Sequence, residues 1–361
     1  MNSVLELSEL NENIGQLFMT GIPEARLDED TRRLIREFNI GGIILFSRNI
    51  EDPVQLADLC NDIQNTAIRY HNDPMFIAID QEGGRVARLK EPFTIFPGNE
   101  AIGLDSNPIK RAREFGSIIA KEMRMVGLNM NLAPVVDVRR GDTEKHLMGR
   151  TFSEDYKKVA ILGATVVRAL QEKGIMAVAK HFPGLGRADI DPHFNLPRID
   201  LDIKEIHDIN IPPFRSAIQE KVSGIMTSHA VYPSLDREYP ATLSSNILDS
   251  LLRKEIGFKG LILTDDLEMG AISNKWGVAE GALASFKAGA DILLICEDQG
   301  KVLESIDMIR DSILRNKISK KRLNESITRI KKARSKLAKP EEKVAFGAIE
   351  NYFKLNEVSP G

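Results

Sequence analysis

Eight short apolar runs recur along this chain, and they constrain its fold more than any other feature. Each run is continuous rather than alternating in polarity, as expected when both faces of a parallel strand are buried. Segments with helical periodicity separate most of them. The runs lie at residues 15–21, 41–46, 75–80, 129–137, 176–181, 224–229, 260–265 and 291–295. Strands alternating with helices over 361 residues predict an α/β fold, a single (β/α)8 barrel of the TIM type.

The segments between the runs place apolar residues three to four positions apart, which is typical of amphipathic helices. We predict helices near residues 53–67, 115–126, 155–173, 212–220, 244–256, 278–288, 303–314 and 320–337. In the last of these, an apolar stripe runs through Leu323, Ile327, Ile330 and Leu337. The many Lys and Arg residues of that segment are interpreted as a solvated face.

The chain has no repeat, low-complexity tract or linker that would mark a second domain. We expect residues 1–338 to form one catalytic barrel and residues 339–361 to form a tail that packs on the barrel or is partly loose. A doubly wound open sheet is the alternative architecture. It is disfavoured because no G-x-G-x-x-G string follows the first run.

Composition argues against several classes of protein. The net charge is only -3, which gives no electrostatic reason to bind nucleic acid or a membrane surface. Cys60 and Cys296 lie far apart in sequence, which argues against a disulfide framework. The first residues, MNSVLELSELNEN, lack the basic start and apolar core of a signal peptide, and no apolar run reaches membrane-spanning length. We therefore expect a cytoplasmic protein, and a monomer.

Ionisable residues fall at the ends of five of the predicted strands. They are Asp80, Asp137, Lys180, His181, His229 and Asp265. The carboxyl ends of the strands share one face of a parallel barrel, and active sites form on that face. Charges there are costly unless they are paired or used, so their coincidence predicts a shared polar pocket. Taken singly, some have structural alternatives: Asp137 as a supporting group, His229 as a hydrogen-bonded core histidine, and Asp266 as a helix cap.

The loop after the fifth strand carries a second group of ionisable residues. Regular structure between residues 182 and 195 is excluded by Pro183, Gly184, Gly186, Pro192 and Pro197, and a loop this long in a barrel is often functional. Asp191 and His193 are two residues apart, so the carboxylate can orient the imidazole and favour its charged form. Opposite Asp265, such a pair would supply a proton donor to a carboxylate nucleophile. The alternative is a surface loop with incidental charge.

A set of strings in order along the chain resembles glycoside hydrolase family 3, and within it the β-N-acetylglucosaminidases of the NagZ type. The strings are IGQLFMTGI, GGIILFSRN, DQEGGRVARL, LNMNLAPVVDV, HLMGRTFSED, KHFPGLGRADIDPH, MTSHAVYP, PATLSSNIL and GFKGLILTDDLEM. The resemblance covers nearly the whole chain up to about Leu337.

The resemblance implies roles for individual residues. Asp265 matches the catalytic nucleophile, His193 the general acid/base, and Asp191 the partner of that histidine. The residues that match those holding the hydroxyls of the N-acetylglucosamine ring are Asp80, Arg150, Lys180 and His181. The position of Arg88 has no role that the resemblance assigns.

Two positions depart from the family pattern. Leu185 stands where the family usually has a histidine, and Pro192 stands where serine is common. Neither change removes the Asp191–His193 pair, although Leu185 takes away a polar group that would lie near the sugar.

The activity implied is that of a retaining β-N-acetylglucosaminidase, which forms a covalent glycosyl-enzyme and needs neither a metal nor an organic cofactor. Its substrate would be a small sugar or muropeptide from peptidoglycan recycling. Close alternatives are a β-glucosidase or a phosphorylase that passes the glycosyl group to phosphate.

Two alternatives belong to other classes. One is a metal-dependent barrel hydrolase built on His181, Asp191, His193 and His229, although such barrels carry an H-x-H string at the first strand and this chain has MTGI there. The other is a catalytically silent sugar-binding protein.

Overall fold

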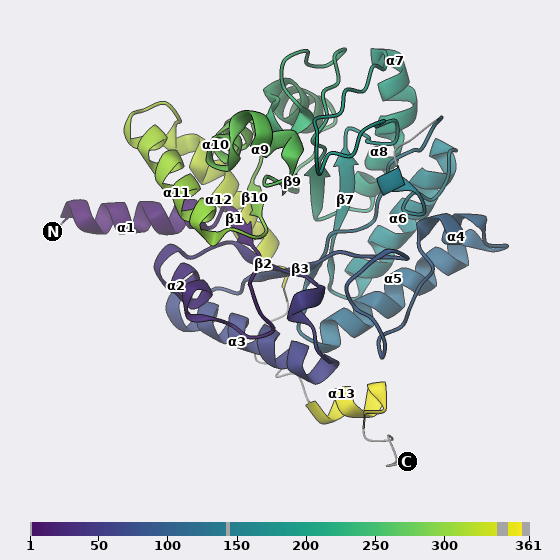
Figure 1. Ribbon diagram of the computed structural model, residues 1–361, viewed down its shortest axis with the longest axis horizontal. Helices are drawn as coiled ribbons and strands as arrows, with labels where there is room; N and C mark the ends of the chain where they lie inside the picture. Colours follow the sequence, from purple (N-terminus) through teal and green to yellow (C-terminus); the bar gives the residue numbers. More distant parts are fainter. Residues whose placement is uncertain (1, 142–144, 338–345, 356–361) are drawn as a thin grey trace.

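Eight parallel strands close into a barrel, with helices arranged around it (Figure 1). The computed structural model describes residues 2–141, 145–337 and 346–355, with the side chains of residues 2–6 left out. The barrel strands are β1 (Phe18–Thr20), β2 (Gly42–Leu45), β3 (Phe76–Ile79), β6 (Met130–Asn131), β7 (Met176–Phe182), β8 (Gly224–Thr227), β9 (Leu261–Asp266) and β10 (Ile292–Ile295). Each of the eight predicted runs overlaps one of these strands, so the predicted (β/α)8 barrel is confirmed.

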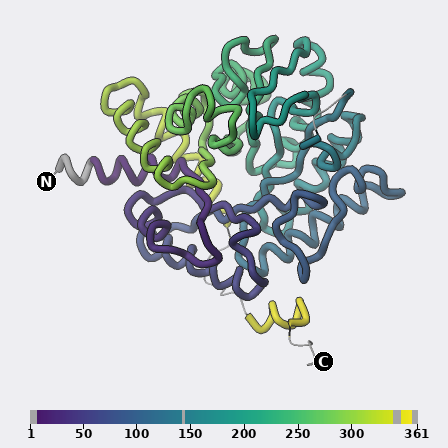
Figure 2. Tube along the Cα trace, viewed as in Figure 1, coloured from purple at the N-terminus to yellow at the C-terminus, as the bar shows by residue number. Residues whose placement is uncertain are grey.

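Barrel closure depends on the pairing of the first strand with the last. Phe18 of β1 pairs with Leu293 of β10, and Met19 pairs with Gly42 of β2 on the other side. Figure 2 shows the beginning of the chain, in purple, beside the green segments that complete the barrel. A closed ring of strands excludes the open doubly wound sheet.

The strands are buried on both faces, which explains the continuous apolar runs. Every residue of β2, β3, β8 and β10 is buried. The fourth strand is much shorter than the predicted 129–137, because Pro134 has no N–H with which to continue a regular ladder. Its backbone still follows β7, with the N–H of Lys180 donating to the carbonyl of Pro134 at 3.1 Å.

The helices that surround the barrel agree with the predicted segments and add several to them. They are α1 (Asn2–Gly15), α2 (Glu29–Phe38), α3 (Pro53–His71), α4 (Asn99–Leu104), α5 (Pro108–Met125), α6 (Tyr156–Glu172), α7 (Ile203–Glu205), α8 (Ile211–Gln219), α9 (Gly270–Trp276), α10 (Val278–Ala288), α11 (Gln299–Leu314), α12 (Lys320–Arg334) and α13 (Phe346–Phe353). Two segments with π-helical hydrogen bonds, η3 (Ile206–Asn210) and η5 (Asn246–Glu255), lie before α8 and β9.

Helix α3 illustrates how local sequence sets the helix ends. Asp52 precedes it and accepts hydrogen bonds from the N–H groups of Val54 and Gln55 at 2.7 and 2.9 Å. Pro53 occupies the first turn, where no N–H is needed. Asn72 ends the helix in the left-handed conformation, with φ of 53°.

A short hairpin after β3 positions part of the candidate site. Its strands are β4 (Gln81–Gly83) and β5 (Val86–Ala87), and the turn between them needs positive φ at both Gly83 and Gly84, which glycine adopts at no steric cost. The side chain of Gln81 holds the hairpin closed, because its Oε1 accepts from the N–H of Leu89 at 2.9 Å.

Part of the predicted tail, residues 346–355, lies within the described residues. Helix α13 packs against the barrel there: Ile349 is buried, and the ring of Phe353 meets that of Phe93 edge to face with 4.7 Å between centroids. The division into residues 1–338 and 339–361 stays a prediction.

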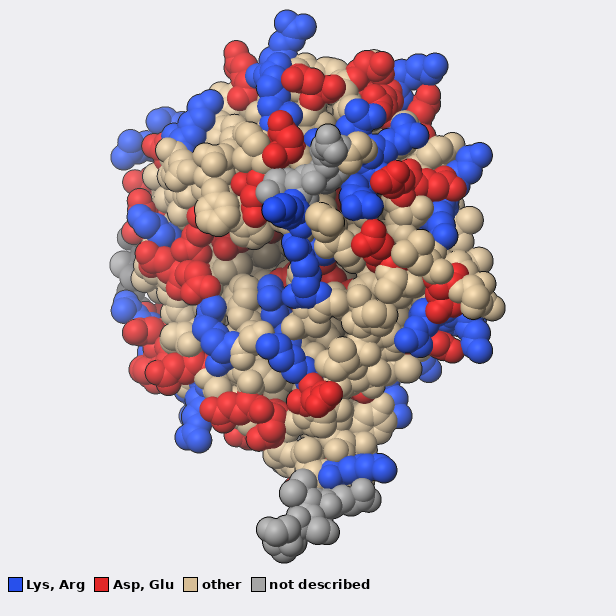
Figure 3. All heavy atoms as spheres, turned by 45° about the vertical axis from the view of Figure 1, so that its right-hand side comes forward, with Lys and Arg blue, Asp and Glu red and all other residues tan. Residues whose placement is uncertain are grey.

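The described surface carries acidic and basic side chains intermixed, around a hollow on the face that Figure 3 presents. Of the helices in the described ranges 2–141, 145–337 and 346–355, none is long and apolar enough to cross a membrane.

Candidate active site

The carboxyl ends of β3, β7 and β9 bring the predicted site residues together on one face of the barrel. Asp80 directly follows β3, Lys180 and His181 lie in the last part of β7, and Asp265 lies in the last part of β9. Asp80 and Lys180 are 100 residues apart in the chain, yet the Nζ of Lys180 donates to Oδ1 of Asp80 at 2.7 Å. The predicted convergence at the strand ends therefore holds for these residues.

Two carboxylates and two cations form a buried ionic network at this face. The Nζ of Lys180 is also 2.7 Å from Oε1 of Glu82, which lies in the β4–β5 hairpin. The Glu82 carboxylate accepts two further hydrogen bonds of 2.8 Å from Nε and Nη2 of Arg150. Only 1% of the Glu82 side chain and 3% of the Lys180 side chain are exposed. Burial at this depth requires pairing, and the network supplies it.

The same contacts keep the members of the network charged. Burial by itself would raise the pKa of Glu82, but the positive charges of Arg150 and Lys180 hold that pKa well below its usual range. Burial by itself would lower the pKa of Lys180. The negative charges of Asp80 and Glu82 have the larger effect, so the pKa of Lys180 is raised above its ordinary value. The site therefore presents fixed charges that need no rearrangement when a polar ligand arrives.

Arg88 lies at the edge of this network. Its Nη2 is 3.4 Å from Oδ2 of Asp80, and its buried Nε has no hydrogen-bond partner among the described residues. An unpaired buried donor beside a carboxylate is suited to a hydroxyl group of a ligand. The resemblance assigned Arg88 no role, and the structure places it among the candidate ligand-binding residues.

His181 links a buried carboxylate to the candidate nucleophile. Its Nδ1 lies 2.7 Å from Oδ2 of Asp137, and its Nε2 lies 3.8 Å from Oδ2 of Asp265. Asp137 is fully buried and also accepts from the backbone N–H of Leu185 at 2.6 Å. Asp137 thus fixes the His181 ring and the start of the following loop, in agreement with the structural interpretation of that residue.

The two acids that end β9 face different surroundings, because side chains alternate along a strand. Asp265 faces His181, and 23% of its side chain is exposed. Burial would raise the pKa of Asp265, but interactions with His181, His229 and Lys180 lower it below its ordinary value. Asp265 is therefore ionised at neutral pH, as a carboxylate nucleophile must be. Burial and the neighbouring carboxylate of Glu268 raise the pKa of Asp266 to about 7.

His229 is a hydrogen-bonded core histidine. Its Nδ1 lies 2.7 Å from Oγ1 of Thr242, and its Nε2 lies 2.9 Å from the carbonyl oxygen of Asp266. Burial lowers the pKa of His229, so the neutral ring is favoured, with Nε2–H donating to the carbonyl. The ring therefore supports the end of β9 and has no ring nitrogen left for a ligand.

The loop of residues 183–197 has no helix or strand, as its prolines and glycines predicted, and it holds the Asp191–His193 pair. Oδ1 of Asp191 lies 2.6 Å from Nδ1 of His193 and accepts from the backbone N–H of the same residue at 3.0 Å. Burial would raise the pKa of Asp191, and these two bonds lower it instead. More than half of the His193 side chain, 57%, is exposed, so its Nε2 is left for a ligand.

Backbone hydrogen bonds attach this loop to helix α9, which follows β9. The N–H of Gly270 donates to the carbonyl of His193 at 2.9 Å, and the N–H of Ala271 donates to that of Pro192 at 3.1 Å. These are the first N–H groups of α9, which have no partner inside the helix. The side chain of Asn274 donates to the carbonyl of Phe194 at 2.9 Å. These bonds fix the position of the Asp191–His193 pair relative to α9, the helix that follows Asp265. His193 and Asp265 themselves form no ion pair within 4.0 Å.

Leu185 has a structural explanation. Its side chain is 2% exposed and lies in the apolar core, while its N–H contacts Asp137. The leucine at this position therefore contributes to the core, and its effect on the sugar site stays a prediction.

Glu82 was assigned no role from the sequence, although it lies in the string DQEGGRVARL that carries part of the family resemblance.

Among residues 2–141, 145–337 and 346–355, no group of three or more His, Cys, Asp or Glu side chains is arranged to hold a metal ion.

Comparison with known proteins identifies the family. Residues 9–333 match the glycosyl hydrolase family 3 N terminal domain. The chain is 35% identical over 342 residues to β-hexosaminidase A of Pseudoalteromonas piscicida, which covers 88% of this chain and 57% of that protein. It is 35% identical, with a TM-score of 0.87, to a family 3 β-N-acetylglucosaminidase from Paenibacillus sp. FPU-7, covering 98% of this chain and 64% of that one.

A third likeness is to a protein of similar length. NagZ from Neisseria gonorrhoeae is 30% identical with a TM-score of 0.78, and the match covers 95% of this chain and 98% of that one. This chain thus spans less than two thirds of the first two relatives and nearly all of the third. The family model and these relatives agree with the motifs in the sequence, and the chain belongs to glycosyl hydrolase family 3.

Proposed function

We propose that this protein is a retaining β-N-acetylglucosaminidase that removes terminal β-linked N-acetylglucosamine. The Asp191–His193 pair carries the proposal, because a histidine oriented by a carboxylate can donate a proton to the leaving group while an ionised Asp265 acts as nucleophile. The relatives named above are a β-hexosaminidase and a β-N-acetylglucosaminidase, which supports the same substrate class.

In the first step, the carboxylate of Asp265 attacks the anomeric carbon and the bond to the leaving oxygen breaks. His193 donates the proton on Nε2 to that oxygen, so the aglycone leaves as an alcohol. Nδ1 of His193 stays hydrogen-bonded to Asp191, whose negative charge stabilises the protonated ring before the transfer. The product is a glycosyl ester of Asp265.

In the second step, water attacks the same carbon and displaces Asp265. The neutral His193 takes a proton from that water at Nε2, which restores the starting state of both residues. Two displacements at one carbon give net retention of configuration. Retaining glycosidases usually use two carboxyl groups, and here a histidine has the role of the second.

The ionic network supplies the sugar-binding part of the proposal. Asp80, Arg150, Lys180 and His181 would contact ring hydroxyls, with Arg88 added on account of its unpaired Nε. Charged groups already fixed by one another bind a polar ligand with little reorganisation. We further propose a muropeptide substrate, a role in peptidoglycan recycling, a monomeric state and a cytoplasmic location, in line with the resemblance of the motifs.

Transfer to phosphate is the alternative that the chemistry of the site keeps open. After the first step His193 is neutral, and a neutral ring repels an incoming anion less than a second carboxylate would. Phosphate could therefore take the place of water in the second step.

One assay separates these activities. Aryl β-N-acetylglucosaminide and aryl β-glucoside are compared with and without inorganic phosphate, and the sugar product is analysed. We expect hydrolysis of the N-acetylglucosaminide, a much lower kcat/KM for the glucoside, and free sugar in both buffers. Accumulation of a sugar 1-phosphate would establish the phosphorylase, and a preference for the glucoside would overturn the substrate class.

A further inference from the structure

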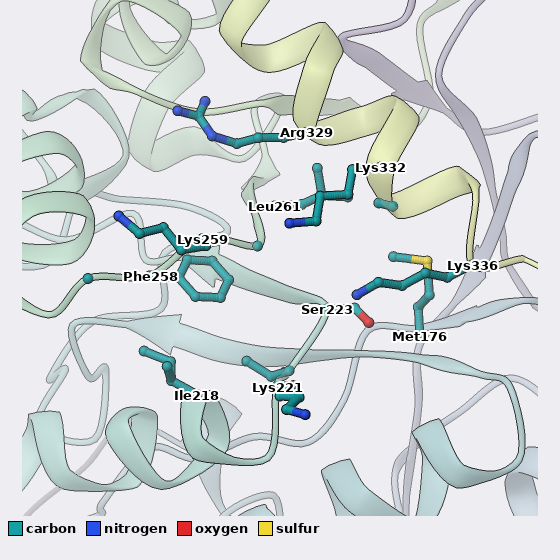
Figure 4. Close-up of a pocket in the computed structure, with 14 residues that line it drawn as sticks. Met176, Ile218, Lys221, Ser223, Phe258, Lys259, Leu261, Arg329, Lys332 and Lys336 are labelled. Carbon is teal, nitrogen blue, oxygen red and sulfur yellow. The ribbon is translucent and has the colours of Figure 1, made fainter.

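A second concave site lies at the opposite end of the strands that carry the candidate active site. It has a volume of 310 Å³ (Figure 4). Met176 at the start of β7, Leu261 at the start of β9 and Ser223 just before β8 contribute to its wall. Met176 and His181 are five residues apart along β7, which corresponds to roughly 16 Å in a strand. This pocket is therefore separate from the candidate active site.

The pocket is lined by cations and by no acidic residue of the described chain. The cationic residues in its lining are Lys221, Lys259, Arg329, Lys332 and Lys336. Arg329 contacts the carboxylate of Asp291 at 3.0 Å, which it shares with Arg253 and Arg322. Each of the four lysines lacks a carboxylate within 4.0 Å among the described residues. Four ammonium groups around one pocket repel one another, so an anion between them would relieve that repulsion.

The lysines converge from three separate elements. Arg329, Lys332 and Lys336 follow helical spacing, so they share one face of α12 and the turn after it. Figure 4 shows Lys332 and Lys336 extending from this segment toward the loop that carries Phe258 and the start of β8. Lys332 and Lys336 are exposed, in agreement with the solvated face predicted from sequence, and both line this open pocket.

Lys221 and Lys259 come from the connections before β8 and β9. Lys221 ends the turn after α8 in the left-handed conformation, with φ of 58°. Next to Lys259, the carbonyls of Phe258 and Gly260 both accept from Nη1 of Arg253. The N–H of Lys259 lies on the opposite side of its trans peptide unit from the Phe258 carbonyl, and it has no hydrogen-bond partner among the described residues.

Apart from Ser223, the side chains that line the rest of the pocket are apolar. Met176, Ile218, Phe258, Leu261 and Ala333 contribute to the lining between the lysines. Lysine ammonium groups are common phosphate ligands, and an apolar wall favours a ligand with an organic body.

We propose that this pocket binds a small organic phosphate, with its phosphoryl groups on the four lysines and its apolar or aromatic body against the floor. The site is independent of the glycosidase chemistry proposed above. Neither the pocket nor its lysines belong to the residues that contact the sugar.

The test measures binding of ATP, pyrophosphate and adenosine by calorimetry, without divalent metal, at about 50 mM and about 150 mM salt. We expect one ATP site per chain, weaker binding of pyrophosphate, undetectable binding of adenosine, and weaker binding of ATP at the higher salt. The double variant Lys332→Gln/Lys336→Gln should weaken ATP binding by roughly tenfold or more, because each ammonium makes a charge-assisted contact.

The matched control is Lys320→Gln/Lys331→Gln, which removes the same charge from the same helix outside the pocket lining. We expect ATP affinity to stay at the wild-type value in this control and glycosidase activity to be unchanged in both double variants. Equal weakening in the two double variants would overturn the proposal in favour of diffuse attraction. Absence of ATP binding to the wild type would also overturn it, and pyrophosphate binding as tightly as ATP would overturn the role given to the apolar floor.

Discussion

Replacing Glu82 by glutamine tests whether the buried ionic network holds the site together. The carboxylate accepts three charge-assisted hydrogen bonds, two from Arg150 at 2.8 Å and one from Lys180 at 2.7 Å. A glutamine keeps one oxygen acceptor, but its NH₂ group is a donor that must face another donor. Glu82→Gln therefore removes the negative charge that pairs with the buried Arg150 and Lys180. The substituted side chain is itself only 1% exposed, so water cannot replace that charge.

The expected loss follows from that burial. Removing one partner of a buried ion pair costs about 3–5 kcal/mol, much of it because the remaining charge stays desolvated. We expect the free energy of unfolding of Glu82→Gln to fall by about that amount. The kcat/KM for an aryl N-acetylglucosaminide should fall with it, since Lys180 keeps only Asp80 as an anionic partner.

The control is the same substitution in a pair of similar geometry at the surface. Glu220 accepts from Nε of Arg168 at 2.8 Å and also contacts its Nη2, but 49% of the Arg168 side chain is exposed. Glu220→Gln should cost less than about 1 kcal/mol, because exposed pairs gain little over their hydration. Urea unfolding of both variants at one pH measures the two losses. Losses of equal size, both below about 1 kcal/mol, would refute the argument that Glu82 is an essential counter-charge.

The remaining predictions concern the candidate catalytic residues and their neighbours. Asp265→Asn should fold normally and lose activity by orders of magnitude, and a 2-fluoro sugar should label Asp265 in the wild type, so that labelling of Asp266 would disprove the assignment. His193→Ala should lower kcat/KM by about 10²–10⁴-fold for sugar leaving groups and much less for activated aryl groups, with Asp191→Asn showing a weaker form of the same profile. An equal loss across leaving groups of graded pKa would mean that His193 only positions the sugar. The pKa of Asp266 is raised from 3.8 to about 7 in the folded state, so its contribution to stability is complete below pH 4 and is lost as the pH rises through 7, by up to roughly 4 kcal/mol. Asp266→Asn should remove that part of the pH dependence of Tm, and an unchanged profile would contradict the shift. Activity should survive EDTA, whereas its loss and recovery with added zinc would favour a metal-dependent hydrolase.

The barrel could be predicted from the sequence because parallel strands buried on both faces leave a continuous apolar run. That signal is strong enough to place each barrel strand, although Pro134 interrupts the fourth one. The convergence of Asp80, Lys180 and Asp265 could also be predicted, since their positions at strand ends become neighbours in any closed parallel barrel.

The partners of these residues could not be predicted. Glu82 lies in a hairpin whose strands are three and two residues long, too short for a periodic signal. The ring of His229 is hydrogen-bonded to Thr242, which follows thirteen residues later after an irregular turn. No helical or strand periodicity would have predicted this contact. The side chain of Leu185 is part of the apolar core, although the surrounding motif contains several residues expected near the sugar. In each case tertiary contacts decide the role, and the local sequence does not carry them.

The way the 183–197 loop is attached to α9 makes the position of the Asp191–His193 pair insensitive to the residue types in the loop. The attachment uses carbonyl oxygens of Pro192, His193 and Phe194, and every residue type has a carbonyl to offer. Proline in place of serine at position 192 therefore leaves the register of the dyad intact. On the other side of the contact no such freedom exists, because a Cβ at Gly270 would lie 2.4 Å from the Phe194 oxygen. Variation can accumulate on the loop while the helix start that receives it stays fixed.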